Sequence, residues 1–575
     1  MKLVYFEINA CVHNNHFIYK RSIPLIFSKS ISIPVNQIMI LFLIFLMPLS
    51  TKAQLIELNQ QETIHTVNYI KDTWPKLTRT HQDLPLSSQD PKLPGILSVK
   101  QKVYISSLEN QSDVMHELKK ILGDRYNEID LIYLPQDFST IKEHGLLYLP
   151  YPYVVPGGRF NEMYSWDSYF IILGLLEEGE IRLAKNMVDN LVYEIDYYGT
   201  ILNANRSYYL TRSNPPLLTE MVIAVYQKTK DKIWLRKVSQ SAEKLYHYWT
   251  RPPHLIKSIG LSRYYDTGNG PAFEVLHGEF DEQGRNYYDK VTSYFQNKKE
   301  SNVDYERFYD RAKDQLTWEF YKSDRTVRES GFDLSNQYGL FGAEIIDYLP
   351  VSLNVLLFQM EKDFASIYKI LGETDKEKFW NKLSNRRKKL INLYMWNEKK
   401  GFYFDYNFLK NRQSNYIYIT TFYPLWAGIA SQHQAKKIVK QLPKFETRCG
   451  LLTSFVMSGQ QWDAPFGWAP LHYFTIQGLK NYGYDTDAKR IALKFINLVN
   501  KDYKKYNVIT EKYNVCDCSS QLNHAIYYGY ASNEIGFGWT SGVYLALFKS
   551  WNKFEPILDD TTDPPICSTK LALNR

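Results

Sequence analysis

The sequence predicts an all-α fold in which helical hairpins repeat to form a single toroid. From about residue 160 onward, apolar residues recur at helical spacing in one segment after another, and Gly/Pro turns separate these segments. No Gly/Ser-rich linker or shift in composition divides the chain. Although 575 residues would allow roughly four domains, repetition without a linker favours one architecture of hairpins of roughly 40–60 residues.

The expected helices follow one another along the chain. Residues 184–195 and 353–371 both carry apolar side chains at positions i, i+3, i+4 and i+7. Five further segments have an amphipathic helical pattern: 217–228, 232–249, 376–396, 471–483 and 486–504. A short piece at 401–406 alternates like a strand. The long irregular stretches 250–330 and 509–540 are expected to be loops at one rim of the toroid, where functional sites usually lie.

Composition and charge exclude several classes of protein. The chain has 46 Tyr, 30 Phe and 12 Trp, which suits a cleft lined by stacking faces and hydroxyls, or an ordinary core. The net charge is +8, but residues 1–53 hold five basic and one acidic residue, so the other 522 residues carry only +4. The basic run 386–389 falls in a helical pattern and indicates a solvated face. We therefore expect no nucleic-acid partner.

The N-terminal segment predicts export. Residues 38–49 form an apolar run of twelve, which is shorter than the roughly 20 residues needed to span a bilayer. Small residues follow this run, as in a secretion signal cleaved after Ala53. An uncleaved N-terminal anchor is the alternative. The expected organisation is a leader at 1–53, one catalytic domain with an N-terminal extension at 54–555, a tail at 556–575, and a periplasmic or secreted location.

The cysteines leave two possibilities. Removal of the leader would leave Cys449, Cys516, Cys518 and Cys567. In an exported protein they could form two disulfides in any of three pairings, or they could remain buried thiols. Their spacing does not match paired zinc ligands, so we expect no metal site.

Two stretches combine aromatic residues, glycine, proline and carboxylates more densely than core packing requires. In the first, at 156–170, a Pro-Gly-Gly turn precedes Arg159, whose fork of donors suits paired hydroxyls, and Trp166-Asp167 offers a stacking face beside an acceptor. The second, at 461–470, has two Trp, two Pro and one Asp in ten residues. Stacking faces next to hydrogen-bonding groups are what sugar recognition needs, although either stretch alone could be a structural turn.

These stretches resemble the trehalases, glycoside hydrolase family 37. The family signatures PGGRFxExYxWDxY and QWDxPxGWAP are both complete here. The resemblance runs from about residue 147 to about residue 547, through NANRSYYLTRSNPP, ESGFD, EKYNV and GFGWTSGV. It implies an (α/α)6 barrel with long rim loops that hydrolyses the disaccharide α,α-trehalose to two glucoses with inversion. It further implies that the reaction needs no cofactor, and we expect a monomer.

The resemblance assigns the two catalytic carboxyls. Inverting hydrolysis needs one protonated carboxyl for the leaving oxygen and one carboxylate that activates water on the opposite face. The family's acid falls on Asp333, at the end of the SGFD stretch, and its base falls on Glu511, at the start of EKYNV. Folding must bring these two residues together and must raise the pKa of the acid.

The resemblance and the two aromatic-rich stretches also give a substrate-binding set. Its members are Arg159, Phe160, Tyr164, Trp166, Asp167, Asn203, Arg212, Ser213, Asn214, Glu274, Gly331, Gln461, Trp462, Trp468 and Trp539. Asn214 occupies a position where many relatives have glutamine. Arg206 is the rival to Arg212 for a sugar contact, and we choose Arg212 because the family's Arg-Ser-Gln stretch aligns there.

Two departures from the family pattern leave other readings open. Ala272 stands where the family's Arg-Pro-Glu triplet has arginine, and a lost charged hydrogen bond costs about 1.5–3 kcal/mol unless another group replaces it. The glycine-rich lid after the base is also missing, with Tyr530 near the family's lid glutamate. Arg263, Lys512 and His524 are candidate replacements for the lost contacts. The alternatives are therefore a different α-glucoside as substrate, or a sugar-binding relative without catalysis.

Overall fold

We analysed a computed structural model, which describes residues 54–93, 100–297, 304–522, 526–528, 532–551 and 554–568. Residues 55–575 form one compact unit. Helices make up most of the described secondary structure and the strands are short, which confirms the all-α prediction. The expected leader at 1–53 lies outside the described residues.

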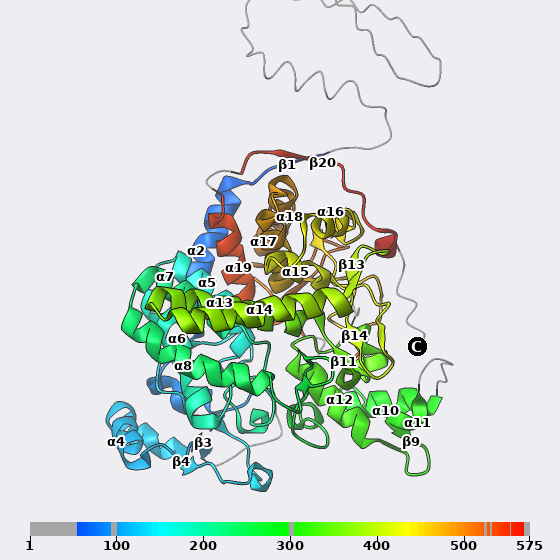
Figure 1. Ribbon diagram of the computed structural model, residues 1–575. Helices are drawn as coiled ribbons and strands as arrows, with labels where there is room; N and C mark the ends of the chain where they lie inside the picture. Colours follow the sequence, from blue (N-terminus) through cyan, green and yellow to red (C-terminus); the bar gives the residue numbers. More distant parts are fainter. Residues whose placement is uncertain are drawn as a thin grey trace, which may run out of the picture. The chain divides into compact units, whose positions relative to one another are not determined.

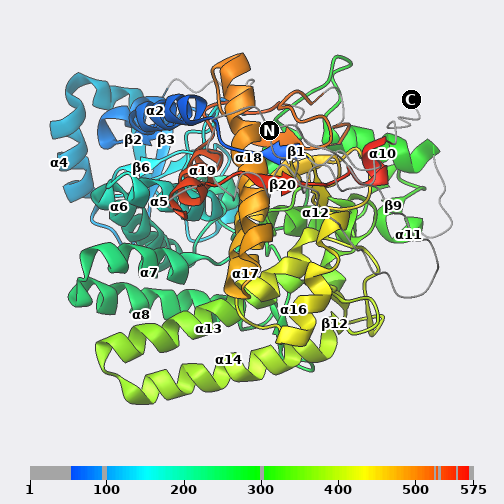
Figure 2. The ribbon, with the colours of Figure 1, turned by 90° about the horizontal axis from the view of Figure 1, so that it is seen from above.

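Six helices form a closed inner ring. They are α5 (Ser165–Glu177), α7 (Leu218–Thr229), α13 (Val351–Leu371), α15 (Tyr423–Trp426), α17 (Ala469–Asn481) and α19 (Gly538–Lys549). Each helix packs against the next, and α19 packs against α5 to close the ring (Figures 1 and 2). The inner helices are apolar on most sides, as in α5, where Phe170, Ile171 and Ile172 are all fully buried.

A second layer of helices covers the ring. Its members are α2 (Gln60–Leu77), α6 (Ile181–Tyr193), α8 (Lys232–Trp249), α14 (Thr374–Tyr394) and α18 (Asp485–Tyr506). They pack on α19, α5, α7, α13 and α17 respectively, and α16 (Gln432–Val439) follows α15 along the chain. In Figure 1 the blue α2 lies beside the red α19, although most of the chain separates them. Inner and outer helices thus make the paired layers of an (α/α)6 toroid.

The sequence predicted most of these helices and misjudged one rim segment. All seven segments with helical periodicity form helices, each within a few residues of the expected bounds. Residues 401–406 hold short strands, as expected. The stretch 250–330 is not simply loop, however, because Trp318–Glu329 forms helix α12. This helix is rich in charged residues, and Asp324, Arg325 and Glu329 are buried and paired rather than exposed.

Short strands and turns build the rim and the N-terminal extension. In the extension, β3 (Gln101–Ile105) pairs in parallel with β4 (Ile129–Tyr133) and β5 (Leu146–Leu147), and α4 (Gln111–Leu122) packs against β4. The remaining helices are α3 (Leu84–Ser87), α9 (Phe273–Leu276), α10 (Tyr287–Asn297) and α11 (Tyr305–Phe308). The remaining strands are β1 (Gln54–Ile56), β2 (Thr78–Arg79), β6 (Tyr153–Val154), β7 (Leu255–Ile256), β8 (Leu261–Ser262), β9 (Tyr309–Asp310), β10 (Gln315–Leu316), β11 (Tyr348–Leu349), β12 (Trp396–Asn397), β13 (Phe402–Tyr403), β14 (Tyr406–Asn407), β15 (Arg412–Gln413), β16 (Glu446–Thr447), β17 (Gly450–Leu451), β18 (Phe466–Trp468), β19 (Lys512–Asn514) and β20 (Ile557–Asp559).

One small ribbon carries the segment that bears the predicted base. Strands β18 and β19 pair antiparallel, so that Trp468 lies opposite Lys512 and Phe466 opposite Asn514. This pairing joins the second aromatic-rich stretch to the EKYNV stretch, and it places Glu511 directly beside the Trp468 end of the ribbon.

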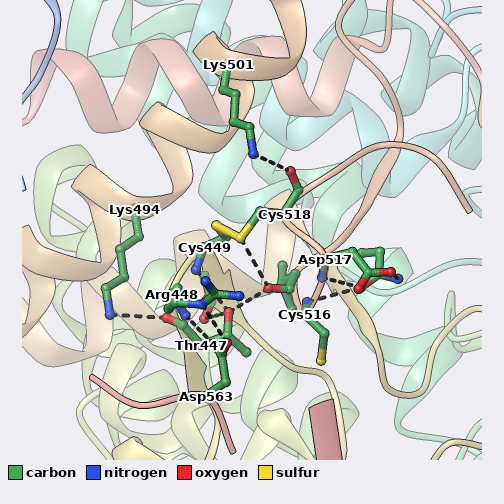
Figure 3. Close-up of a disulfide and its surroundings, with 12 residues drawn as sticks. Thr447, Arg448, Cys449, Lys494, Lys501, Cys516, Asp517, Cys518 and Asp563 are labelled. Atoms are coloured by element: carbon green, nitrogen blue, oxygen red, sulfur yellow. Dashed lines mark hydrogen bonds and ion pairs between the residues drawn. A yellow bond between two sulfur atoms is a disulfide. The ribbon is translucent and has the colours of Figure 1, made fainter. Parts of the chain in front are cut away.

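These four cysteines form two disulfides. Cys449 is bonded to Cys518, as Figure 3 shows, and Cys516 is bonded to Cys567. The two bonds connect the β16–β17 turn, the loop after β19 and the C-terminal segment. Of the two possibilities that the sequence left open, disulfides and buried thiols, the structure has the disulfides, in this pairing.

Near the disulfides, an ion-pair cluster also holds the C-terminal segment. Lys494 is fully buried and donates to Glu446 at 2.7 Å, to the Thr447 carbonyl at 3.1 Å and to Thr561 at 2.8 Å. Arg448 pairs with Asp563 at 2.6 Å. Across the described part of the chain, the search for a helix long and apolar enough to span a membrane finds none.

Candidate active site

A cavity of about 340 Å³ opens at the rim of the toroid and collects most of the predicted site residues. That volume is within the range of small-molecule sites. The predicted residues that line it are Arg159, Phe160, Tyr164, Trp166, Asp167, Asn203, Arg212, Asn214, Glu274, Gly331, Asp333, Trp462, Glu511 and Trp539. They come from segments more than 350 residues apart in sequence, so only the closed ring brings them together.

Asp333 follows the end of α12 and lies at the cavity wall with 30% of its side chain exposed. Gly331 has a φ of +77°, which favours glycine and lets the chain turn from the helix into the cavity. Desolvation by the surrounding protein raises the pKa of Asp333 to about 6, although the nearby Arg328 cation opposes this rise. Below that pH, Asp333 keeps a proton that it can donate.

Glu511 precedes β19 and is held through its main chain. Its amide donates to the Glu534 carbonyl at 3.0 Å, and its own carbonyl accepts from Trp539 Nε1 at 2.9 Å. Its side-chain Oε2 lies 2.9 Å from Lys512 Nζ. The carboxylate is 2% exposed and faces the same cavity as Asp333.

A third carboxyl lies among these groups. Asp167, in the first turn of α5, is buried, and both burial and the negative charges of Glu511 and Asp333 raise its pKa well above the usual value. A protonated carboxyl can donate a hydrogen bond to a hydroxyl. The site therefore combines three carboxyls, two of which have raised pKa values, and this suits acid–base chemistry on a neutral, hydroxyl-rich ligand.

Two of the arginines that line the cavity were predicted from the sequence. Arg212 is buried and pairs with Glu274 at 2.5 Å and with Asp266 at 3.0 Å. Arg159 pairs with Glu279 at 2.6 Å and with Glu534 at 3.3 Å. Both guanidinium groups are fixed by carboxylates, which leaves them oriented before any ligand enters.

Aromatic rings form the apolar wall. Trp462 stacks flat on Trp468 with ring centroids 3.8 Å apart and an interplanar angle of 5°. Trp539 meets both rings edge-on, and Trp166 lies 6.3 Å from Trp462. Trp462 thus presents a supported face to the cavity, which suits the apolar face of a sugar ring.

Three predicted binding residues do not appear in the lining that the described residues form. Trp468 backs Trp462 and donates from Nε1 to the Gln461 carbonyl at 3.0 Å. Ser213 donates from Oγ to the Ile201 carbonyl at 2.6 Å. Gln461 bonds to Lys512 and to the main chain of Asp333. They support the residues that line the cavity.

The rival arginine has a structural place. Arg206 is buried and donates to Glu162 and to the carbonyls of Ser87, Ser88 and Gln89, which ties the N-terminal extension to the toroid. Among the described residues that line the cavity it does not appear, whereas Arg212 does.

The structure adds residues that the sequence reasoning missed. Arg328 lines the cavity beside Asp333, and Tyr209, Tyr287 and Glu279 line it as well. Arg328 could have been found, because it stands only five residues before Asp333, but its segment was expected to be a loop. It also acts electrostatically on Glu274, and so supplies a cation near the position where Ala272 replaces the family's arginine.

The other candidate replacements fare differently. Arg263 donates to the carbonyls of Pro253 and Ile346, away from the described cavity lining. Lys512 is bonded to Glu511, behind the lining. His524 and Tyr530, which belong to the segment that replaces the family's lid, lie outside the described residues.

Comparison with known proteins places the chain in a family. The Trehalase family model matches residues 49–552. The cytosolic neutral trehalase of Kluyveromyces lactis is 38% identical over 443 residues, covering 70% of this chain and 57% of the relative. That of Saccharomyces cerevisiae is 36% identical over 454 residues, covering 72% and 59%. The chain thus spans less than three fifths of the length of these curated relatives.

The fold has a matching solved structure. Neutral trehalase Nth1 from Saccharomyces cerevisiae superposes with a TM-score of 0.71 at 31% identity, covering 85% of this chain and 94% of that one. The relatives correct one prediction, however. The apolar run at 38–49 predicted an exported protein, but the two curated relatives described above are named cytosolic, so the predicted periplasmic or secreted location is wrong. The signature stretches, the closed helical ring and the matching family model agree, and the chain belongs to the trehalase family, glycoside hydrolase family 37.

Proposed function

We propose that this chain hydrolyses the α,α-1,1-glycosidic bond of trehalose to two glucose molecules with inversion, using Asp333 as acid and Glu511 as base. One observation carries the proposal: both carboxyls line the same 340 Å³ cavity in different environments, since burial raises the pKa of Asp333 to about 6 whereas the Lys512 ammonium lies 2.9 Å from Glu511. Two carboxyls with different environments are what an acid–base pair requires.

In this proposal Asp333 protonates the leaving oxygen. Its proton is retained below pH 6 and is available at the cavity wall. As the bond to the leaving glucose breaks, the proton moves from Asp333 to the glycosidic oxygen, and the electron pair of that bond goes with this oxygen. The Arg328 cation stabilises the carboxylate that remains.

Glu511 completes the reaction by accepting a proton from water. The water attacks the anomeric carbon from the opposite face and becomes the new hydroxyl of the second glucose. Lys512 Nζ, 2.9 Å from Glu511 Oε2, favours the ionised form that a base needs. Inversion at one centre gives one β-glucose and one α-glucose from each trehalose.

The remaining lining residues would bind the two sugars. Arg159 and Arg212 offer donors to hydroxyls, protonated Asp167 offers a further donor, and Trp462 offers a stacking face. We assign substrate binding to the lining residues of the predicted set, together with Arg328. The protein would act in the cytosol, as the names of its relatives suggest, and as a monomer, which light scattering can test.

Glucose release tests the proposal. The wild type, Asp333→Asn and Glu511→Gln would be assayed on trehalose, maltose, kojibiose and nigerose. We expect trehalose to be cleaved, and each variant to lose about 10²–10⁴-fold in kcat. Asp405→Asn is a matched control: Asp405 is also buried with a pKa raised to about 6, but it bonds Val351 and Gln337 instead of facing the cavity. Its kcat should stay within a few-fold of the wild type.

The outcomes separate the alternatives. Cleavage of trehalose that survives both substitutions would contradict the assigned roles. A folded wild type that cleaves another disaccharide better than trehalose would favour a different α-glucoside, and one that binds sugars in calorimetry without cleaving any would favour a non-catalytic relative. NMR of the first products should show α- and β-glucose in equal amounts; α-glucose alone would contradict inversion.

A further inference from the structure

We infer that Gln461 and Lys512 are positioning residues that hold the acid Asp333 and the base Glu511 in a fixed relation through one chain of hydrogen bonds. This inference rests on the proposed function, since it concerns the same pair of carboxyls. It assigns a role to two side chains that do not exchange a proton with the substrate in the proposed reaction.

The chain of bonds runs from base to acid. Lys512 Nζ donates to Glu511 Oε2 at 2.9 Å and to Gln461 Oε1 at 3.1 Å. Gln461 Nε2 in turn donates to the main-chain carbonyl of Asp333. The orientation of the Gln461 amide is determined by its partners, because an ammonium can only donate and a carbonyl oxygen can only accept. A single amide thus connects the two catalytic segments, which are 178 residues apart.

Both connecting residues are held rigidly. Lys512 is fully buried, donates also to the Ser532 carbonyl at 2.9 Å, and lies 5.5 Å from the centre of the Trp468 ring. Gln461 is 1% exposed, and its carbonyl accepts from Trp468 Nε1 at 3.0 Å. A side chain with several short bonds in a buried place has few alternative rotamers, so it can hold its partners to a defined geometry.

Substrate contact is a poor explanation for these two residues. Neither appears among the described residues that line the cavity, whereas their chain neighbours Trp462 and Glu511 do. Burial of an ammonium is costly unless a carboxylate accompanies it. Here the accompanying carboxylate is Glu511 itself, which indicates that the lysine serves the base.

The inverting reaction explains why such a connection matters. The acid and the base must stay roughly 6.5–9.5 Å apart to leave room for a water molecule. A displacement of about 1 Å in a reacting group can cost about 10²-fold in rate. Because Gln461 bonds the Asp333 main chain and Lys512 bonds the Glu511 side chain, a shift in either segment is transmitted to the other.

The charge of Lys512 has a second effect. Asp333 and Asp167 both act as like charges on Glu511. Glu534 and Glu279 face Lys512, and both pair with Arg159. The ammonium offsets the repulsion among the carboxyls and so favours the charged form of Glu511.

Substitutions at both positions test the inference with trehalose as substrate. For Lys512→Met we expect kcat to fall about 100-fold. In a plot of kcat against pH, the acidic limb, which follows the ionisation of Glu511, should move to higher pH by about one to three units. KM should change by no more than a few-fold. For Gln461→Leu, which keeps the shape but removes both bonds, kcat should fall at least about 10-fold without a shift of that limb. Lys512→Arg should keep the limb and lower kcat.

A second buried lysine provides the control. Lys494 is also fully buried and paired with a glutamate, but it holds the C-terminal segment. Lys494→Met should lower the melting temperature and leave kcat and both limbs of the profile unchanged. If any loss of a buried charge shifted the acidic limb of the pH dependence of kcat, both Lys494→Met and Lys512→Met would show the shift. The inference predicts it for Lys512→Met alone.

Several results would overturn the inference. One is a folded Lys512→Met variant with the wild-type acidic limb; another is a Gln461→Leu variant with wild-type kcat. If Lys512→Met does not fold, Lys512→Arg and Gln461→Leu decide the matter, and wild-type kcat in both refutes a positioning role. A wild type that does not cleave trehalose would instead refute the proposed function, so the two failures are distinguishable.

Discussion

Arg328 Nη1 lies 3.7 Å from Asp333 Oδ2 at the wall of the cavity. The rest of the guanidinium group is fixed, because Nε and Nη2 donate to Asp324 at 3.1 and 3.0 Å. Burial raises the pKa of Asp333 to about 6, and Arg328 is the strongest influence in the opposite direction. The position of the acid's titration thus depends on a balance between desolvation and one neighbouring cation.

The first prediction concerns that balance. In Arg328→Met the opposing cation is lost, so the pKa of Asp333 should rise above 6 by about one unit or more. The acid is active while protonated and is lost as pH rises through its pKa, so the alkaline limb of kcat/KM should move to higher pH. Arg212 and Glu511 also act on Asp333 and are unchanged in this variant. Arg328→Lys keeps the charge and should keep the limb; an unmoved limb in Arg328→Met would contradict this account.

The second prediction concerns the departure at position 272. Ala272 is fully buried, and its amide donates to Tyr288 Oη at 2.8 Å. Arg325 donates to the adjacent Pro271 carbonyl, and Arg212 and Arg328 already act on Glu274. An arginine placed here would be overpacked among other cations, so Ala272→Arg should lose about 1–3 kcal/mol in the free energy of unfolding and gain no activity.

Urea unfolding and trehalose assays check this expectation. Ala272→Ser, which adds one atom, is the control and should change stability by less than the arginine does. A gain in kcat/KM on trehalose by Ala272→Arg would show instead that the missing arginine limits activity, and that Arg328 does not compensate for it.

Seven of the inner and outer helices could be predicted because the burial of their side chains follows a period of 3.6 residues, whereas α5 and α19 are apolar on most sides and were not predicted. The segments 232–249 and 353–371 form helices where apolar spacing placed them. Ring closure does not follow from this period, since α5 and α19 meet only in the folded chain. Helix α12 was missed for a different physical reason: its charged residues are buried in pairs, and a sequence does not show which charges have partners.

At the site, the family signatures identified residues that line the cavity, but they did not show which signature residues line it and which support the lining. Gln461 and Trp468 stand in the same signature as Trp462, and only the fold shows that they support Trp462 and Glu511 from behind. Local sequence places residues near the site, whereas the direction of each side chain depends on strand pairing such as that of β18 with β19.

The third prediction concerns the two disulfides. They close loops with sequence separations of 69 and 51 residues, and in the chain-entropy model each such bond contributes about 4 kcal/mol. Dithiothreitol should therefore lower the melting temperature. The double variant Cys516→Ser/Cys567→Ser should melt below the wild type and lose less on reduction. A variant with all four cysteines replaced by serine should not respond to dithiothreitol; equal melting of oxidised and reduced wild type would contradict the prediction.

The last prediction concerns the contact that closes the ring. At Gly542 of α19, an added Cβ would lie 1.9 Å from the Phe170 carbonyl oxygen and 2.7 Å from its carbon, and both are main-chain atoms of α5. Main chain cannot move aside as a flexible side chain can, so Gly542→Ala should force α19 away from α5. We expect a loss of about 3 kcal/mol or more in the free energy of unfolding, or failure to fold.

Activity should fall with stability in this variant, because the first turn of α19 holds the base. Trp539 Nε1 donates to the Glu511 carbonyl at 2.9 Å, and Thr540 Oγ1 donates to the Thr510 carbonyl at 2.8 Å. A displaced α19 would therefore move Glu511 along with it. Lys549→Ala, at the exposed end of the same helix, is the control and should remain within about 0.5 kcal/mol of the wild type. If Gly542→Ala keeps wild-type stability and kcat, the close approach of α5 and α19 is not what fixes the ring.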